Sequence, residues 1–304
     1  MEEIPGFQKL MLPLLKFASD KKEHSGSEVL EFLYKEFDLN EEQKNQMLQS
    51  GNQKVFSNRA NWARAYLKMA GLIESTKRSH FKITERGLDT LNQNPSELNL
   101  KYLNRFPEYI EIKKTWRKDN SQEENEEDST SPQTPEESLE ISYHDIRKNL
   151  AQEILSKIKL CSPSFFEKMV VELLVKMGYG GSRSDAGKAI GKSGDEGIDG
   201  IIKEDKLGLD IIYIQAKKWE NVVGRPEIQK FVGALAGQGA KKGIFITTSR
   251  FTNEAKDYIP RNETKIVLID GEQLSNLLID NSLGVSSQAV YEVKKIDLDY
   301  FEEE

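Results

Sequence analysis

The sequence Gly194-Asp-Glu-Gly-Ile-Asp-Gly200 leads through a short apolar run to Ile-Ile-Tyr-Ile-Gln-Ala-Lys-Lys at residues 211–218. The second run alternates as a strand does, so Tyr213, Gln215 and Lys217 share one face. A turn signal at residues 204–208 predicts a hairpin that pairs this strand, antiparallel, with the run after Asp199. Such a pairing brings Asp199 beside Gln215 and Lys217.

The chemistry of these three side chains suggests an active site. A carboxylate oxygen, an amide oxygen and an ammonium group at one sheet edge can hold a hard cation and activate water against a phosphodiester. The structural alternative is that Asp199 forms a turn and that Gln215 and Lys217 lie on a solvated strand face. The residues around the site favour the first interpretation.

Ordered sequence blocks surround this stretch. They are Ser162-Pro-Ser-Phe-Phe-Glu167, Met177-Gly-Tyr-Gly-Gly181, Gly194 to Gly200, Gln215-Ala-Lys217, Val223-Gly-Arg-Pro-Glu227 and Phe245-Ile-Thr-Thr-Ser249. In these blocks the chain resembles the Mrr restriction family, whose catalytic domain belongs to the PD-(D/E)xK nuclease superfamily. The resemblance covers nearly the whole chain. The elements read from residue 144 onward run α, β, β, α, β, α, β, which is typical of an α/β sandwich around a mixed sheet; its first core strand is expected within 182–193.

The resemblance implies metal-dependent hydrolysis of DNA phosphodiester bonds. Asp199 would bind Mg²⁺, with Mn²⁺ as another candidate, together with the side-chain oxygen of Gln215 and the backbone carbonyl of Ala216. Lys217 would orient the attacking water and offset charge in the transition state. No histidine cluster or cysteine pair offers other metal ligands, because the chain has three scattered histidines and one cysteine.

One position departs from the wider superfamily. Gln215 stands where an acid is commoner, although glutamine is usual in the Mrr-like branch. A neutral ligand binds Mg²⁺ less strongly, and Glu167 and Asp195 are the acids that could compensate. Glu167 lies on the helix that begins at Pro163 and occupies the family's position for an acid facing the metal; otherwise it is a solvent-facing glutamate.

By resemblance, the biological role is that of a type IV restriction endonuclease, which cleaves foreign double-stranded DNA carrying modified, for example methylated, bases. Cleavage of both strands implies a homo-oligomer, either a dimer or a tetramer. Two alternatives remain open. One is a structure-selective nuclease of DNA repair or junction resolution, and the other is a DNA-binding regulator with a degenerate nuclease domain. The intact Asp199, Gln215 and Lys217 count against the regulator.

The N-terminal part predicts a winged-helix domain. Apolar residues at helical spacing mark helices at 7–19, 27–37 and 58–70, followed by short strands at 72–74 and 80–83 and a helix capped by Thr84. In a winged helix the third helix enters the major groove and the hairpin touches the backbone. Residues 54–86 carry a net charge of +6. The candidate DNA contacts are Arg59, Asn61 and Arg64 on the helix and Lys77 and Arg78 on the hairpin; the alternatives are a solvated face or a protein-interaction module.

The order of elements and the composition predict domains at 1–95 and 144–304, joined by a segment at 96–143. Residues 119–140 hold nine acids and no base and predict a flexible linker. The glycine-rich loop at 187–193 lacks one residue of a nucleotide-binding loop, so we interpret Lys188 and Lys192 as contacts to a DNA backbone.

The overall charge of −7 hides an uneven distribution. Without the acids of 119–140 and of 297–304, the remainder carries +7, so the acidic composition does not exclude a DNA partner. No apolar run approaches the roughly 18 residues of a membrane span, and the first residues lack the features of a signal peptide. The sequence therefore predicts a cytoplasmic protein without a membrane partner.

Overall fold

The structure is a computed structural model that describes residues 3–117, 133–180, 198–205, 207, 209–258, 264–294 and 296. These residues form two compact units. The first unit extends to His144 and includes Lys294, and the second extends from Asp145 to Val293. None of the helices within these ranges is long and apolar enough to cross a membrane.

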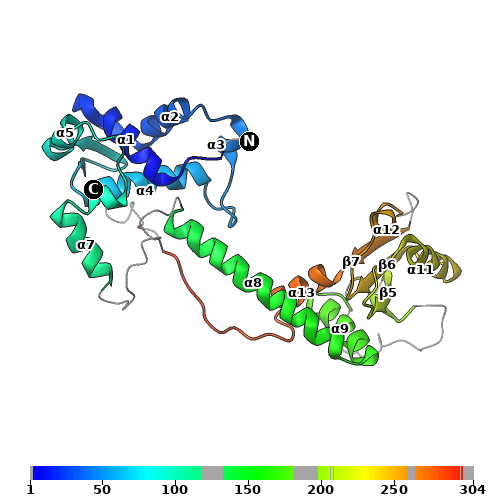
Figure 1. Ribbon diagram of the computed structural model, residues 1–304. Helices are drawn as coiled ribbons and strands as arrows, with labels where there is room; N and C mark the ends of the chain where they lie inside the picture. The colour runs from blue at the N-terminus through cyan, green and yellow to red at the C-terminus, as the bar shows by residue number, and fades with distance from the viewer. Residues whose placement is uncertain are drawn as a thin grey trace. The chain divides into compact units, whose positions relative to one another are not determined.

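The first unit contains short helices and a small sheet (Figure 1). In chain order the elements are α1 (Phe7–Phe17), the 3₁₀ helix η1 (Ala18–Asp20), β1 (His24–Ser25), α2 (Gly26–Glu36), α3 (Glu41–Asn45), α4 (Val55–Met69), β2 (Ile73–Ser75), β3 (His80–Ile83), α5 (Glu85–Asn92), α6 (Leu100–Leu103) and α7 (Pro107–Arg117). The three strands pair antiparallel in the order β1-β3-β2. Helices α1, α2 and α4, the β2–β3 hairpin and helix α5 follow one another in the order predicted for a winged helix.

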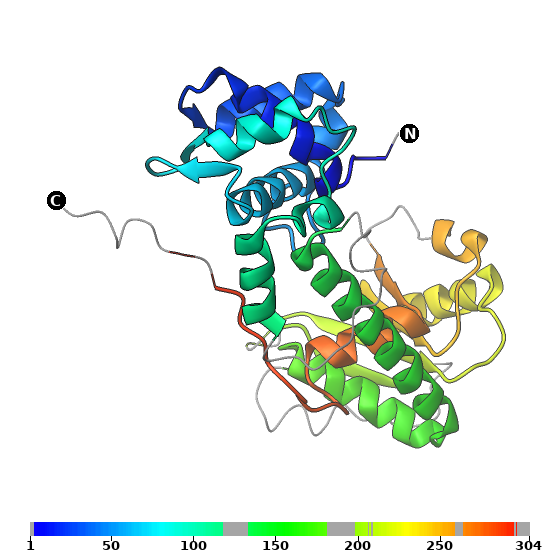
Figure 2. The same cartoon turned by 60° about the vertical axis from the view of Figure 1, so that its left-hand side comes forward.

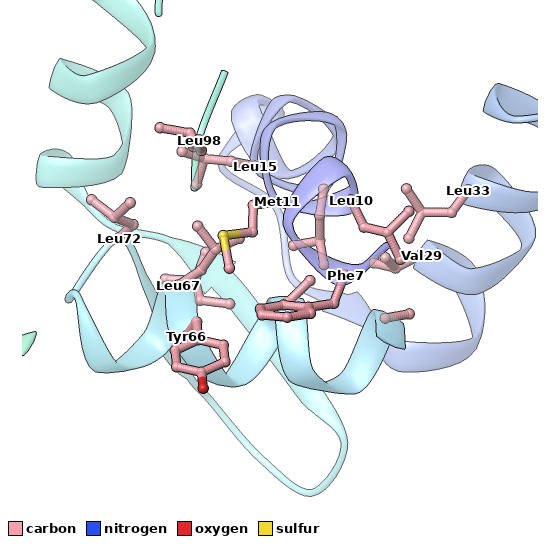
Figure 3. Close-up of a cluster of buried hydrophobic side chains, with 14 of the residues drawn as sticks. Phe7, Leu10, Met11, Leu15, Val29, Leu33, Tyr66, Leu67, Leu72 and Leu98 are labelled. Carbon is pink, nitrogen blue, oxygen red and sulfur yellow. The ribbon is translucent and has the colours of Figure 1, made fainter. Parts of the chain in front are cut away.

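Local sequence signals explain where these helices begin and end. Ser25 and Glu28 form a capping box at the start of α2, and the Thr84 hydroxyl accepts from the Gly87 N–H at the start of α5. Gly71, with φ of +68°, ends α4 in a left-handed turn. The buried faces of α1, α2 and α4 meet in one core, in which Phe7, Met11 and Leu67 lie close together (Figure 3).

Figure 2 shows the β2–β3 hairpin projecting from the rest of the first unit. Residues 74–79, which include its turn, are all exposed. Helix α4 begins at Val55, three residues earlier than predicted, and α3 lies between α2 and α4 where no helix was predicted. The wing and the predicted third helix are therefore present.

The predicted linker needs a correction at its C-terminal end. Residues 135–140 are the first turns of α8 (Pro135–Leu160), and Thr134 is fully buried. The sequence Thr134-Pro-Glu-Glu137 is a helix start, with a hydroxyl cap, a proline in the first turn and a glutamate three residues after the cap. These local signals outweigh the acidic composition that predicted a flexible chain here; residues 118–132 lie outside the described ranges.

In the residues that the structure describes, the second unit is a four-stranded mixed sheet covered by helices. Its elements are the later turns of α8, α9 (Pro163–Lys176), β4 (Gly200–Lys203), β5 (Ile211–Lys217), α11 (Arg225–Gly237), β6 (Lys242–Thr247), α12 (Asn253–Asp257), β7 (Lys265–Ile269) and α13 (Gly271–Asp280). The strand order is β4-β5-β6-β7, with β4 antiparallel to β5 and the remaining pairs parallel. The predicted hairpin and mixed sheet are confirmed, whereas the first core strand expected at 182–193 falls outside the described residues.

The two faces of this sheet have separate cores. Ile212, Ile214 and Ala216 of β5 pack in one cluster with buried residues of α9 and α13. Phe245 of β6 packs on the other face with Phe231 of α11 and residues around α12. Figure 1 shows α11 and α12 on one side of the sheet and α9 and α13 on the other. The alternation of β5 therefore directs Tyr213, Gln215 and Lys217 to the face of α11.

Candidate functional site

The β4–β5 hairpin brings Asp199 and Gln215 together as predicted. Gly200 pairs with Ile214, and the Asp199 N–H donates to the Ile214 carbonyl at 2.9 Å, so the next position along β5 opposite Asp199 is Gln215. The Ala216 N–H donates to Asp199 Oδ2 at 2.7 Å. In an extended strand the N–H and C=O of one residue point to the same edge, so the Ala216 carbonyl is directed toward Asp199 as well.

Gln215 is the unusual member of this group. The residue is 6% exposed, and its Oε1 has no hydrogen-bond partner among the residues that the structure describes. A buried acceptor that lacks a donor costs free energy, so such an atom calls for an explanation. Lys217 follows on the same strand face, partly exposed. The strand register thus places Asp199, Gln215 and Lys217 around the same end of β5.

The donor set fits a hard divalent cation. Asp199 offers a carboxylate, Gln215 an unpartnered amide oxygen and Ala216 a backbone carbonyl, and oxygen ligands of these kinds are those that Mg²⁺ and Ca²⁺ prefer. Within the described ranges, no three carboxylate, histidine or cysteine side chains gather at a distance suited to a metal ion. Asp195, the other acid considered from the sequence, lies outside those ranges.

Glu167 lies on α9, partly buried, next to Phe166 of the core stripe. The buried residues of α9 pack on the sheet face of Ile214 and Ala216, which is opposite to the face of Gln215. No hydrogen bond or ion pair between described residues joins Glu167 to Asp199. Its catalytic role stays a prediction.

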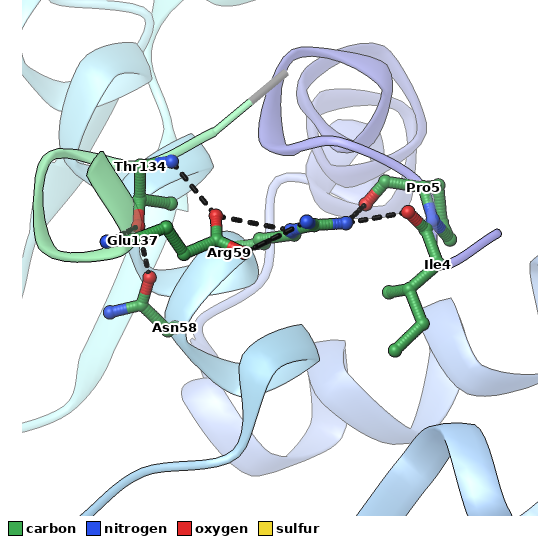
Figure 4. A network of polar contacts seen from close by, with 6 residues as sticks. All are labelled: Ile4, Pro5, Asn58, Arg59, Thr134 and Glu137. Atoms are coloured by element: carbon green, nitrogen blue, oxygen red, sulfur yellow. Dashed lines mark hydrogen bonds and ion pairs between the residues drawn. The ribbon is translucent and has the colours of Figure 1, made fainter. Parts of the chain in front are cut away.

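Arg59 binds other parts of the protein, whereas the positive charge of its segment had suggested a contact with DNA. Its Nε and Nη2 donate to Glu137 at the start of α8, the shortest of these contacts being 2.8 Å, and its Nη1 donates to the carbonyls of Ile4 and Pro5 (Figure 4). The Arg59 side chain is 12% exposed. All three of its nitrogen atoms therefore bind protein acceptors, which argues against the predicted DNA contact.

Asn61 and Arg64 lie on another side of α4. Asn61 is exposed, and its Oδ1 is 3.4 Å from Arg64 Nη2. Burial lowers the pKa of the Arg64 guanidinium, and the structure shows no carboxylate paired with it among the described residues. Arg64 packs against Gly26 at the start of α2, where an added Cβ would come within 2.6 Å of Nη1. A partly desolvated cation on the outer side of this helix is suited to an anionic ligand.

The hairpin candidates are exposed. Lys77 forms an ion pair with Glu23 at 3.1 Å, in which both side chains are accessible to solvent, and Arg78 is exposed at the tip. Surface pairs of this kind contribute little and exchange readily for another anion. Lys188 and Lys192 lie outside the described residues, so their predicted contact to DNA stays a prediction.

Comparison with known proteins agrees with this arrangement. Residues 158–278 match a family described as "Restriction endonuclease", and residues 7–93 match the "Mrr N-terminal domain". The chain belongs to the Mrr restriction endonuclease family. A relative from Escherichia coli strain K12, described as "Type IV methyl-directed restriction enzyme EcoKMrr", is 39% identical over 306 residues that cover 98% of this chain and 99% of the relative. The Mrr family thus accounts for both units.

A weaker likeness concerns a solved structure, "MspJI Restriction Endonuclease in Complex with 27-mer Oligonucleotide". It is 21% identical, covers 43% of this chain and 31% of that chain, and has a TM-score of 0.31. A match of that size establishes neither fold nor function. The Mrr assignment rests on the family matches and on the full-length relative.

Sequence reasoning missed the buried polar cluster that contains Glu137, the partner of Arg59. Thr134, Glu137 and Asn58 are at least nine-tenths buried and joined by hydrogen bonds. The Thr-Pro-Glu-Glu signal at 134–137 predicts the start of a helix and was available in the sequence. Nothing in the sequence indicates that Arg59, 78 positions earlier, is the partner of Glu137.

Proposed function

We propose that this protein is a type IV restriction endonuclease that hydrolyses phosphodiester bonds of methylated or otherwise modified DNA with the help of Mg²⁺. The single observation that carries the proposal is the pairing of Asp199 with Gln215, whose buried Oε1 lacks a donor among the described residues. The description of the full-length relative as a methyl-directed restriction enzyme supports the choice of substrate.

In the proposed mechanism, Asp199, Gln215 and the Ala216 carbonyl would hold the cation. The bound cation would supply Lewis-acid chemistry, which lowers the pKa of water and neutralises phosphate charge. Lys217 donates hydrogen bonds to the attacking water and to the phosphate oxygens, and its charge offsets the negative charge that develops in the transition state. Mn²⁺ has the same preference for oxygen ligands and should substitute for Mg²⁺.

DNA recognition falls to the first unit in this proposal. Asn61 and Arg64 on α4 read the major groove, while Lys77 and Arg78 on the wing contact phosphates. A restriction enzyme that cuts both strands needs two active sites, so we expect a homo-oligomer. Restriction acts on incoming DNA, and the cytoplasm is the compartment that this function implies.

A cleavage assay on paired DNA substrates, identical except for methylation, tests the proposal. With Mg²⁺ the wild-type protein should cleave the methylated substrate and leave the unmethylated one intact; EDTA should stop cleavage. Cleavage of branched DNA without regard to methylation would instead indicate a structure-selective nuclease. Binding without any cleavage would indicate a regulator.

Two variants separate the roles within the site. Asp199→Ala should lose Mg²⁺ binding and cleavage together. Lys217→Ala should retain both Mg²⁺ and DNA binding but lose about 10²- to 10³-fold in the rate of the chemical step, because one transition-state contact is removed. Cleavage by Lys217→Ala at the wild-type rate would move the chemistry away from β5.

A further inference from the structure

The start of helix α8 is built onto helix α4. Thr134 and Glu137 form a capping box: the Thr134 N–H donates to Glu137 Oε2 at 2.8 Å, and the Glu137 N–H donates to Thr134 Oγ1 at 3.3 Å. The same hydroxyl donates to Asn58 Oδ1 at 2.6 Å, and the same carboxylate binds Arg59 (Figure 4). The two residues that cap α8 are therefore also the residues that contact α4.

This contact is buried and charged. The side chains of Arg59 and Glu137 are 12% and 9% exposed. A buried pair of this kind specifies an arrangement, because removing one partner leaves the other charge uncompensated. A second contact lies one turn further along α4, where the indole N–H of Trp62 donates to the carboxylate of Glu136. The first turn of α8 thus has one defined position on α4.

Helix α8 continues without interruption from Pro135 to Leu160. Its later turns belong to the second unit, where Ala151 and Ile158 are buried and Arg147 donates to Asp280 Oδ1 at 2.6 Å. One helix therefore begins on the proposed DNA-reading helix and, through Ile158, contributes to the core of the nuclease unit.

We propose that Arg59 and Glu137 are a positioning pair, which ties α8 to α4 so that DNA bound at α4 is coupled to cleavage in the nuclease unit. This inference rests on the proposed function. Arg59 then serves the reaction through Glu137 and touches neither DNA nor the reacting phosphate. The outer side of α4, with Asn61 and Arg64, is left for DNA.

The inference separates binding from cleavage in one experiment on the full chain. Glu137→Gln keeps the size of the side chain but removes the charge that holds Arg59. DNA affinity, measured without divalent metal, should be unchanged, as should its dependence on salt. Single-turnover cleavage with Mg²⁺ should fall by roughly 5- to 150-fold, the usual range of a coupling between sites. Glu108→Gln is the matched control, because Glu108 pairs with Arg86 in the same unit but is half exposed.

Trp62→Phe is a second variant that leaves no buried charge unpaired. It removes the N–H that binds Glu136 and should lower the cleavage rate by a smaller factor, again with unchanged DNA affinity. If Glu137→Gln does not fold, Trp62→Phe tests the inference by itself. Three results would overturn the inference. The first is cleavage at or above the wild-type rate in the folded variants. The second is a change of about 0.9 in the salt slope of Glu137→Gln, which is the size of one phosphate contact. The third is the same loss of cleavage in Glu108→Gln. If the wild type neither binds nor cuts DNA, the proposed function fails instead.

Discussion

Replacing Gln215 with methionine should make the metal-free protein more stable and abolish its response to Mg²⁺. Gln215 is 6% exposed, and its Oε1 has no donor among the described residues. A buried polar atom without a partner costs about 1–3 kcal/mol, and methionine fills a similar volume without one. In EDTA the free energy of unfolding of the second unit should therefore rise by about 1–3 kcal/mol. For a unit of this size the Tm should rise by about 2–12 °C.

Mg²⁺ should stabilise the wild type but not Gln215→Met. A ligand that binds only the folded protein stabilises it by about 2.7 kcal/mol when its concentration is 100 times Kd. Wild-type Tm should thus increase with Mg²⁺, whereas the Tm of Gln215→Met should stay constant, so that the difference between the two proteins shrinks or reverses. Thermal unfolding in EDTA and across a Mg²⁺ series measures both effects.

Gln229→Met is the matched control, because Gln229 is exposed on α11 of the same unit. It should change stability by less than about 0.5 kcal/mol and leave the Mg²⁺ response intact. A fall in Tm of Gln215→Met in EDTA would show that the amide is satisfied within the protein. An equal Mg²⁺ shift in wild type and Gln215→Met would show that the ion binds elsewhere.

Three further predictions concern the first unit and its comparison with the second. Gly87→Ala should destabilise the protein by about 1–3 kcal/mol, because the new Cβ would lie 2.2 Å from the Leu72 carbonyl oxygen. Gly233→Ala, in an open position on α11, should stabilise it by about 1 kcal/mol. Thermal unfolding of the two variants measures the sign of each change. Arg64→Ala should weaken DNA binding and reduce the salt slope by about 0.9, measured by titration at several salt concentrations. The hydrogen bond from the Arg86 guanidinium lowers the pKa of Glu108. This pair therefore stabilises the fold above the ordinary carboxyl pKa and stops doing so as the pH falls through the lowered pKa. The stability difference between Glu108→Gln and wild type, measured from pH 7 downward, should shrink as Glu108 binds a proton.

The hairpin of the candidate site was predictable because its signals are local. Alternation along β5 and the turn signal at 204–208 fix which residues share a face. A register error of one residue would move Gln215 to the opposite face of the sheet, where α9 packs. The pairing of Asp199 with Gln215 follows from these two signals alone. The absence of a donor for Gln215 Oε1 could not be predicted from these signals, because it depends on every element packed around β5.

The role of Arg59 was not predictable in the same way. Positions 59 and 64 are separated by about 140° around an α-helix, so they cannot serve one flat surface equally. Which of the two is covered depends on Glu137, a residue distant in sequence whose acidic neighbours suggested a solvated linker. Net charge sums over a segment, whereas DNA contact requires a particular side of a helix, and only tertiary structure distinguishes the sides.

The neutral side chain at position 215 also has a physical consequence for the metal-free enzyme. An unpartnered amide at a position 6% exposed costs a few kcal/mol at most, but an ionised carboxylate there would cost far more or would have to bind a proton. With glutamine at position 215, the metal-free site therefore needs no bound cation to neutralise a buried carboxylate at that position. On the proposed mechanism the same choice weakens the hold on Mg²⁺, since only Asp199 supplies a negative charge among the described ligands. Activity should then follow the concentration of free Mg²⁺ more closely than in a site with two carboxylates.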